Sequence, residues 1–464
     1  MRLRRVFAVA AVLPMIIPGY VTTLSYIFLF GRNGIITYQW LDITWDVYSW
    51  KSVLIIQSMD LTTTAFFLIS AVLVSVDSRI EDSGRNLGAS EWQVFETITL
   101  PLIWPGLIAA LLLTFMRSMA DFGTPLIVGG PFDTLASASY TQLIGRYNMA
   151  MAATLNVVLL AITMVAFWLY ARGQSSRVGI GAQSEGGARK PLQFSRPVKT
   201  ALWTIACTFS VVIVMFLVSV FLAAFTKHIG GNYAFTLEHF RILPNRGWNS
   251  TENTLIFATV TAIIMSLLGM VIAYIVTRIE FKGRSILDWL TTLPFAIPGT
   301  FMGVGFALAF NRSPLLLTGT WMIIIACTVI RELPLGLRAG VSVLMQQDRS
   351  IEDASASLGG SKITTFFRIV LPMARPALLV SAIYAFVSTV QTLGAIIFLI
   401  TPGTKLLSVD VFEAVIRGDV GDAAALSMIM IVLAAMGVIA IYLLSMREAA
   451  QTWFRKMMVS RAQA

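Results

Sequence analysis

A polar stretch of sequence occurs twice in this chain, as SIEDASASLGGSKITTFFRIVLP from Ser350 to Pro372 and as RIEDSGRNLGASEWQVFETITLP from Arg79 to Pro101. The two copies match without a gap at one offset (350 − 79 = 271). Each copy has an acidic pair, then small residues, a Leu-Gly step and a final Leu-Pro. Such agreement indicates an internal repeat, in which two parts of the chain share one structural plan.

The composition indicates that lipid is the main solvent of this chain. Of its 464 residues, 57% are hydrophobic and 12% are charged, which is too little charge to cover the surface of a soluble protein of this size. Many apolar runs reach the roughly 20 residues that a membrane-spanning helix needs. The sequence therefore predicts an all-α polytopic membrane protein.

The net charge of +10 does not indicate nucleic-acid binding, because Lys and Arg cluster in short loops between the apolar runs, as the positive-inside rule expects. The two cysteines, Cys207 and Cys327, lie inside apolar runs and suit neither a disulfide framework nor a zinc site. The two histidines, His228 and His239, are too few to build a metal site alone. We expect no metal site, no cofactor bound by this chain and no nucleic-acid partner.

The apolar runs predict about ten membrane spans, four in the first half and six in the second. They cover about 6–30, 52–76, 101–128, 149–171, 200–225, 252–277, 285–310, 315–346, 372–399 and 424–445. If the spans alternate, one side of the membrane receives the basic residues: Arg2, Arg4, Arg5, Arg189, Lys190, Arg278, Lys282, Arg284, Arg349, Lys362, Arg368, Arg447, Arg455 and Lys456. That side is cytoplasmic by the positive-inside rule. Both termini and both polar stretches are therefore expected on the cytoplasmic face of the membrane.

A segment rich in Gly, Ser and basic residues, 172–198, is typical of a flexible cytoplasmic linker. We predict a first repeat at 1–171 and a second at 199–464. Matched residues in the first repeat are Asp77, Glu81, Asp82, Leu87, Gly88, Leu100, Pro101, Pro105 and Gly123, and each recurs 271 positions later.

The repeat continues upstream of the polar stretches. LPMIIPGY (Leu13–Tyr20) matches LPFAIPGT (Leu293–Thr300) at an offset of 280 (293 − 13 = 280). The second repeat has two spans before this motif and the first has none, so the first repeat is expected to lack two helices. Either the protein is naturally shortened or its start codon is placed too late.

Each polar stretch predicts a short helix–turn–helix outside the membrane. Asp82 and Asp353 each follow a Glu near a helix start, where carboxylates favour the positive end of the helix dipole. Gly88 and Gly359 are expected to end the first helix, because glycine readily adopts the left-handed conformation. The small residues between them are expected to leave a smooth face for close contact. A second, amphipathic segment leads to Leu-Pro, where proline opens the next helix.

The shared pattern, acidic–small–small–x3–Gly–x9–Ile–x–Leu–Pro, resembles the cytoplasmic EAA loop of ABC-importer permeases, the helix that docks into a groove on the ATPase subunit. The resemblance implies docking roles for Glu81, Asp82, Gly88, Glu352, Asp353 and Gly359. Both copies place Asp where the family motif has Glu. The preceding Glu is a second candidate for the contacting carboxylate, and the sequence leaves this choice open.

Two such loops in one chain resemble the fused permeases of the ferric-iron type, and ADFGTPLIVGG (Ala120–Gly130) and RELPLGLRAG (Arg331–Gly340) are similar to that branch. The resemblance implies two tandem parallel repeats of the type I permease fold that work by alternating access, and as partners two copies of an ABC ATPase, an extracytoplasmic substrate-binding protein and membrane lipid. Permeases for aminoethylphosphonate, thiamine and polyamines are near relatives and stay alternatives. No Gly-x4-Gly-Lys-Ser/Thr loop occurs. We therefore expect a transport subunit rather than an enzyme, with ATP and Mg used by the partner.

Ionisable residues inside the bilayer are costly and are functional candidates by default. The candidates for the translocation pathway are Asp60, Arg117, Asp121, Arg331, Glu332 and Gln391. Asp60 and Arg331 correspond at the offset of 271, and we hypothesise that they face a shared central cavity and partly neutralise each other. For Arg117 and Asp121, which lie one turn apart, an intrahelical salt bridge and a functional role are both open.

Two other classes of function are alternatives to a permease. An ion-coupled secondary transporter would use the charged residues to carry protons and the polar stretches only to hold the halves together. A membrane-embedded enzyme is disfavoured, because no nucleophile–base or metal-ligand cluster occurs among the spans.

Overall fold

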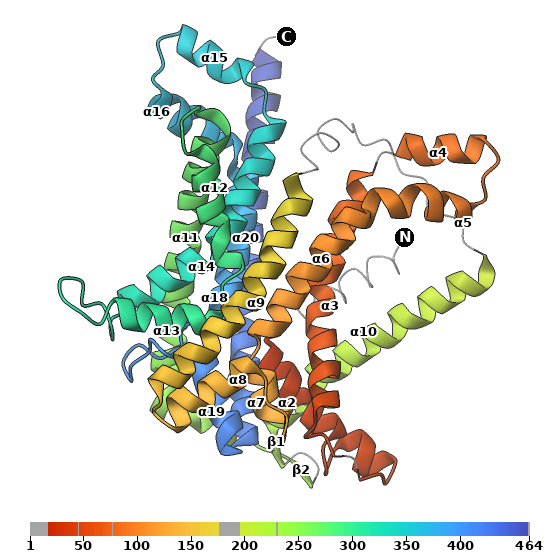
Figure 1. The fold of residues 1–464 in the computed structure, drawn as a ribbon, viewed down its shortest axis with the longest axis vertical. Helices are drawn as coiled ribbons and strands as arrows, with labels where there is room; N and C mark the ends of the chain where they lie inside the picture. Colours follow the sequence, from red (N-terminus) through yellow and green to blue (C-terminus); the bar gives the residue numbers. More distant parts are fainter. Residues whose placement is uncertain (1–16, 45, 77, 176–194, 229–230, 463–464) are drawn as a thin grey trace. The chain divides into compact units, whose positions relative to one another are not determined.

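The computed structural model describes residues 17–44, 46–76, 78–175, 195–228 and 231–462. The chain forms two compact units, unit 1 with Met1–Arg241 and Val411–Met428, and unit 2 with Ile242–Asp410 and Ile429–Ala464. The regular structure is almost entirely helical, as Figure 1 shows. The prediction of an all-α polytopic fold is confirmed.

Unit 1 contains most of the first half of the chain. Its elements are α2 (Gly19–Phe30), η2 (Ile35–Trp40), α3 (Trp50–Ser75), α4 (Ser78–Asn86), α5 (Glu91–Val94), η3 (Phe95–Thr99), α6 (Leu100–Ala120), α7 (Gly123–Val128), α8 (Leu135–Tyr140), η4 (Thr141–Gly145), α9 (Met149–Ser175), α10 (Arg196–Phe225), β1 (Thr226–His228), β2 (Asn232–Phe235) and η5 (Glu238–Arg241). Strands β1 and β2 form an antiparallel hairpin. Helix α6 packs against α3 and α9, and α10 packs against α2.

Unit 2 contains the second polar stretch. Its elements are η6 (Leu243–Gly247), α11 (Trp248–Arg278), α12 (Arg284–Thr292), η7 (Leu293–Phe295), α13 (Gly299–Ala309), α14 (Trp321–Gln346), α15 (Ser350–Ser357), α16 (Lys362–Thr365), η8 (Phe366–Val370), α17 (Leu371–Met373) and α18 (Arg375–Gln391). Helices α19 (Leu407–Arg417) and α20 (Val420–Ala462) each have residues in both units. The core of unit 2 is formed by α11, α14 and α18.

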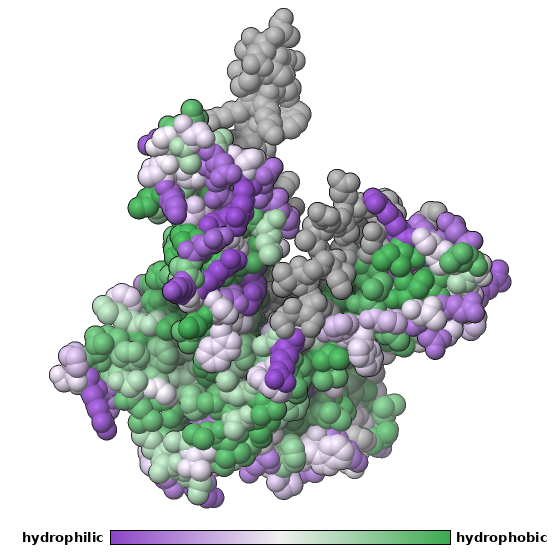
Figure 2. Space-filling model, turned by 45° about the horizontal axis from the view of Figure 1, so that its top comes forward, coloured by the Kyte–Doolittle hydropathy of each residue, from purple (hydrophilic) through white to green (hydrophobic). Residues whose placement is uncertain are grey.

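The expected spans can be compared with the helices one by one. Among the described residues, six helices are long and apolar enough to cross a membrane, or eight if two bent helix pairs each count as one span. The remaining two of about ten expected runs are α2 and α14. Part of the run at 6–30 lies outside the described residues, and α14 is 26 residues long but carries charges near its middle, among them Arg331 and Glu332. Much of the surface in Figure 2 is hydrophobic (green), as lipid contact requires.

Among the described residues, three of the expected spans are interrupted. The run at 285–310 bends by 110° between Phe295 and Gly299, and the other two runs are interrupted at equivalent places. The run at 101–128 is broken after Ala120, where α6 ends and the short α7 follows. The run at 372–399 is broken after Gln391, where α18 ends and a series of turns follows. These ends correspond at the repeat offset (391 − 120 = 271). The break is thus part of the repeated plan, and the expectation of two continuous spans is wrong.

Several sequence expectations fall on residues that the structure does not describe. They are the basic N-terminus with Arg2, Arg4 and Arg5, the start of LPMIIPGY, Asp77, and most of the linker with Arg189 and Lys190. The described chain resumes at Ser195, and α10 begins at Arg196.

Glycines set the spacing of the core helices in unit 2. A Cβ atom at Gly269 of α11 would lie 2.7 Å from the carbonyl carbon of Gly336 in α14. A Cβ atom at Gly340 would lie 2.6 Å from the Cβ of Ala273. Small residues allow membrane helices to approach at backbone distance, which strengthens their packing in lipid. The pair α11–α14 is therefore a closely packed, stiff element.

We expect Gly269→Ala to destabilise the protein by about 1–3 kcal/mol, because the added methyl group overpacks this helix contact. The matched control is Gly305→Ala in α13, where a Cβ atom would meet nothing within 4 Å. Thermal unfolding in detergent, followed by circular dichroism, measures both variants. Equal melting temperatures for the two variants would contradict the close-packing argument.

Candidate functional site

The two polar stretches, polar loop 1 (79–101) and polar loop 2 (350–372), form the predicted helix–turn–helix structures. Helix α4 leads through a tight turn into α5 and η3, and α15 leads through an equivalent turn into α16 and η8 (Figure 1). Gly88 and Gly359 follow the first helix with φ of 89° and 81°. The prediction that a left-handed glycine ends this helix is confirmed in both loops.

The second helix of each loop is built in the same way. Ser90 and Ser361 cap it, and their hydroxyl oxygens accept hydrogen bonds from the amides of Gln93 (3.3 Å) and Thr364 (3.2 Å). Each short α-helix then passes into a π-helical turn, Phe95–Thr99 or Phe366–Val370. Both turns precede Leu-Pro, where the proline supplies no amide hydrogen for the helical ladder. These π-turns, a feature frequent at functional sites, were not predicted from the sequence.

In each acidic pair the glutamate is buried or mostly buried, and the aspartate that follows it lies nearer the surface. Glu81 is fully buried, and its Oε1 accepts a hydrogen bond from the Thr99 hydroxyl (2.8 Å). Its counterpart Glu352 is mostly buried and forms an ion pair with Arg278, with 2.8 Å between Oε1 and Nε. Glu81 thus binds within its own loop and Glu352 binds the end of α11, so the exposed surface of each loop is formed mainly by other residues.

The following aspartates lie on the surface. Asp353 is exposed and forms no ion pair with a described residue. Asp82 accepts a hydrogen bond from Arg85 (2.7 Å), which also binds Glu91 (3.0 Å). Hydrogen bonds with Glu91 and Asp82 hold the pKa of Arg85 above its ordinary value. Asp82 is therefore partly neutralised, whereas Asp353 carries the freer charge.

One small residue after each acidic pair faces inward, whereas Ser83, Ala354 and Ala356 are exposed. A Cβ atom at Gly84 would lie 2.6 Å from Cδ1 of Ile98, so this position lets α4 contact its own second helix. In polar loop 2 the equivalent Ser355 hydrogen-bonds the Thr365 hydroxyl at 2.8 Å. The expectation that these residues leave a smooth outer face is wrong for Gly84 and Ser355.

Exposed apolar side chains mark the surface of both loops, and the sequence reasoning did not select them as site residues. They occur at three matched positions: Ile80 with Ile351, Leu87 with Leu358, and Trp92 with Ile363. Leu87 is 89% exposed and Leu358 is 90% exposed, each beside its left-handed glycine. Leu87 and Leu358 were already visible as a matched apolar pair within a polar repeat. Repeated exposure of this kind is typical of a protein contact surface.

The candidate charges of unit 1 gather at the break after α6. Asp121 lies one residue beyond α6, and its carboxylate accepts hydrogen bonds from Gln57 (3.0 Å) and from the amide of Thr124 (3.2 Å). Arg117 donates to the Thr64 hydroxyl at 3.3 Å. The interpretation of Arg117 and Asp121 as an intrahelical pair is therefore wrong, because the helix ends between them.

Asp60 of α3 belongs to the same cluster. Both Arg117 and Asp121 lie close enough to act on its carboxylate electrostatically. A Cβ atom at Gly19, the first residue of α2, would lie 3.3 Å from Oδ2 of Asp60. The carboxylate thus lies at the amino-terminal end of a helix, where the dipole favours a negative charge.

Unit 2 has an equivalent cluster of different charge. Arg331 donates to the Thr392 hydroxyl at 2.9 Å, and Thr392 corresponds to Asp121. The buried Glu332 accepts a hydrogen bond from Ser388 at 2.8 Å and lies 3.9 Å from the Arg331 guanidinium. Gln391 is the half-buried last residue of α18, immediately before the break.

In this cluster too, a glycine at the start of a helix lies beside the charged group, here Arg331. A Cβ atom at Gly299, the first residue of α13, would lie 3.3 Å from Nη1 of Arg331. Gly19 and Gly299 correspond at the upstream offset (299 − 19 = 280). Asp60 and Arg331 therefore occupy matching positions, each beside the start of a short helix and the break of a long one. Whether the two residues neutralise each other stays a prediction.

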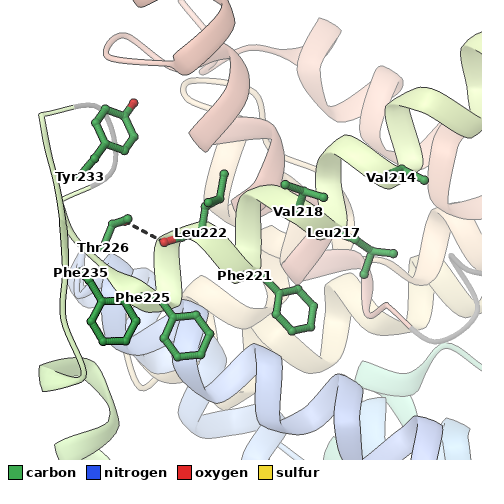
Figure 3. A pocket seen from close by; sticks show the side chains of 9 residues that line it. All are labelled: Val214, Leu217, Val218, Phe221, Leu222, Phe225, Thr226, Tyr233 and Phe235. Atoms are coloured by element: carbon green, nitrogen blue, oxygen red, sulfur yellow. Dashed lines mark hydrogen bonds between the residues drawn. The ribbon is translucent and has the colours of Figure 1, made fainter.

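An apolar groove of about 500 Å³ lies on the outer side of unit 1. Figure 3 shows it between α10 and the β1–β2 hairpin, where Phe225 and Phe235 stack with ring centroids 5.9 Å apart. The Thr226 hydroxyl at its edge donates to the carbonyl of Leu222 at 2.8 Å. The groove suits a hydrocarbon chain and presents no set of charged groups for an ion.

Comparison with known proteins agrees with this arrangement. The family model described as "Binding-protein-dependent transport system inner membrane component" matches residues 1–174 and 265–452. The ferric transport system permease protein FbpB of Actinobacillus pleuropneumoniae is 34% identical over 443 residues, which cover 91% of this chain and 63% of that protein.

Two further relatives extend the comparison. The putative ferric transport system permease protein FbpB 1 of Haemophilus influenzae is 35% identical over 85% of this chain and 64% of its own length. The molybdenum transport system permease protein ModB of Escherichia coli K12 is 34% identical over 36% of this chain and 76% of its own length. The chain spans less than two thirds of the length of both ferric relatives. With most of its length matched by one family model, the chain belongs to the family of binding-protein-dependent transport system inner membrane components.

Proposed function

We propose that this chain is the permease subunit of an ATP-driven ABC importer and forms the pathway for ferric iron by alternating access. Two copies of an ABC ATPase would bind the polar loops on the cytoplasmic side, and an extracytoplasmic binding protein would deliver the substrate. The names of the two ferric relatives support iron over aminoethylphosphonate, thiamine or polyamine. ATP and Mg would be used by the ATPase. Both termini would lie in the cytoplasm with the polar loops.

One observation carries this proposal: the two polar loops share their turns, helix caps and exposed apolar positions at matched residues. The matched left-handed glycines, serine caps and π-turns set equivalent surfaces on two loops. A solvated connecting loop has no reason to repeat its apolar exposure, whereas a pair of identical partner subunits requires two similar contact surfaces. In this proposal Asp82 and Asp353 are the contacting carboxylates, because the neighbouring glutamates are held inside.

The pathway is proposed to be lined by the two charge clusters at the helix breaks. Non-helical backbone at membrane depth is tolerated where it is buried in protein or lines a water-filled cavity. Charged groups inside a membrane protein usually face such a cavity and mark the route of ions. The clusters around Asp60 and Arg331 combine both features, which supports a role in translocation.

The docking surface can be tested through its exposed leucines. We expect Leu87→Ser combined with Leu358→Ser to weaken ATPase binding by about 2 kcal/mol or more, as for a hot spot at the centre of an interface. Co-purification of the co-expressed ATPase subunit with the tagged permease measures this loss.

The matched control is Leu316→Ser, because Leu316 is 65% exposed in the segment that precedes α14. The control should keep full ATPase co-purification. If the double leucine variant also kept it, together with ATP-dependent uptake of ferric iron, the proposed docking surface would be wrong.

A further inference from the structure

Polar loop 2 is tied to the helices of unit 2 through one buried arginine. Arg278 is the last residue of α11, and its Nε lies 2.8 Å from the Glu352 carboxylate in α15. Its Nη2 donates to the carbonyl oxygens of Leu344 and Gln347, both at 2.9 Å. One guanidinium thus joins the end of α11, the end of α14 and the start of α15.

The geometry uses properties that only arginine combines. The planar guanidinium has five N–H donors in a fixed fork, so it can bind a carboxylate and two carbonyl oxygens at once. The last carbonyl groups of a helix have no partner within the helix, and a cation is favourable at this negative end of the dipole. Arg278 therefore caps α14 while its charge holds Glu352.

A second arginine, in polar loop 2, forms a hydrogen bond back to the end of α11. Arg349, at the start of α15, donates to the carbonyl oxygen of Thr277 near the end of α11 (3.1 Å). Tyr274 donates to Oε2 of Glu352 at 3.4 Å, and its ring lies 5.0 Å from the ring of Phe366 in η8. Polar and apolar contacts thus link both helices of polar loop 2 to α11.

In polar loop 1 the equivalent glutamate, Glu81, has a different hydrogen-bond partner. Glu81 accepts its hydrogen bond from Thr99, which belongs to the second helix of the same loop. Thr99 corresponds to Val370 in polar loop 2, which has no hydroxyl group to offer. In polar loop 2 the ion pair with Arg278 thus takes the place of the threonine hydrogen bond and links the loop to α11.

We propose that Arg278 is a positioning residue that couples polar loop 2 to α11 and α14, so that a displacement of this loop moves the closely packed helices with it. The inference rests on the proposed function only in assigning the displacement to an ATPase.

The contact between Arg278 and Glu352 can be tested without any partner subunit. Hydrogen–deuterium exchange of the full chain in nanodiscs would compare Arg278→Met and Glu352→Gln with the wild-type protein. We expect exchange of the amides at 350–358 to rise about tenfold or more, because local opening no longer breaks an ion pair, while the amides at 78–86 stay unchanged.

The control is Arg338→Met, which removes an exposed ion pair between α14 and Asp288 in the same unit (3.2 Å). Its exchange at 350–358 should remain that of the wild type. Wild-type exchange in Arg278→Met, or an equal rise in Arg338→Met, would overturn the proposal. Glu352→Gln keeps both carbonyl caps, so a rise in this variant assigns the effect to the ion pair rather than to misfolding.

A second measurement tests the coupling role. In proteoliposomes with the ATPase and an iron-loaded binding protein, Arg278→Met should retain ATPase binding but hydrolyse about fivefold or more ATP per ferric ion transported, as for loss of a coupling free energy between sites. Arg278→Lys, which keeps the charge, should lie between this variant and the wild type. Unchanged ATP use per ion in Arg278→Met would overturn the coupling role. A wild-type chain that bound no ATPase would instead refute the proposed function, while the exchange result would still report on the contact between Arg278 and Glu352.

Discussion

Valine in place of both Gly88 and Gly359 is expected to abolish co-purification of the ATPase and to reduce ferric uptake to background. The two glycines have φ of 89° and 81°, a backbone conformation that costs an L-residue about 1–2 kcal/mol and a β-branched one more. A Cβ atom at either position would meet nothing within 4 Å, so the strain comes from the backbone alone. Relief of this strain would move Leu87 and Leu358 away from their present positions.

The asparagine variants provide the matched control for this prediction. Asparagine visits the left-handed region more readily than other non-glycine residues, so Gly88→Asn with Gly359→Asn should retain most ATPase binding at similar side-chain volume. Circular dichroism should show the same helix content for both double variants, because each glycine lies in a turn between helices, where a Cβ atom would meet nothing within 4 Å. Valine variants that bound ATPase and transported iron as well as the asparagine variants would contradict the role of the turns.

Arg331→Met is expected to lower ferric uptake about 100-fold, which corresponds to roughly 2.7 kcal/mol, while ATPase binding is retained. The change removes the central cation of the unit 2 cluster and its hydrogen bond to Thr392. It also leaves the buried Glu332 without its guanidinium neighbour. Uptake of labelled iron into proteoliposomes and co-purification of the ATPase measure the two effects separately.

Two variants decide whether the arginine acts in the pathway. Arg312→Met removes an exposed arginine outside the cluster and should transport normally. Arg331→Met with Glu332→Gln removes both charges. If this double variant recovered wild-type uptake, Arg331 would serve only to neutralise Glu332, and the pathway role would be rejected.

The expected partial neutralisation of Asp60 by Arg331 has its own test. Asp60→Arg combined with Arg331→Asp exchanges the charges of the two matching positions. We expect the exchange to restore part of the uptake that each single change removes. A double variant that rescued neither single change would reject the hypothesis that the two residues face one cavity.

The polar loops were largely predictable because their structure is local. A left-handed glycine and a carboxylate in the first helical turn act over a few residues, so the pattern around Gly88 and Gly359 was sufficient. The serine caps are equally local, but they were recognised only in the structure. The repeat added confidence, since two independent copies fulfilled the same local rules. The π-turns were missed because the apolar pattern of a short helix does not distinguish a π-helical register from an α-helical one.

The interruptions of the membrane helices were not predictable from hydropathy. The residues around Ala120 and Gln391 are followed by apolar sequence. Hydropathy averaged over about 20 residues therefore stays high across these helix ends and does not reveal them. The helix end depends instead on specific contacts, such as the hydrogen bonds of Asp121 with Gln57 and Thr124. For the same reason the sequence did not show that α6 ends between Arg117 and Asp121.

By itself, the sequence determined that this is a helical membrane protein with two repeats and that each repeat carries a polar helix–turn–helix with a glycine stop. Those properties follow from hydropathy and from backbone preferences that act over a few residues. Only the tertiary structure decided which member of each acidic pair turns inward. Glu352 is held by Arg278, 74 residues earlier (352 − 278 = 74), and Glu81 by Thr99 of its own loop. A carboxylate is buried only where distant groups supply its hydrogen bonds and countercharge, and the packing of the helices alone brings those groups to it.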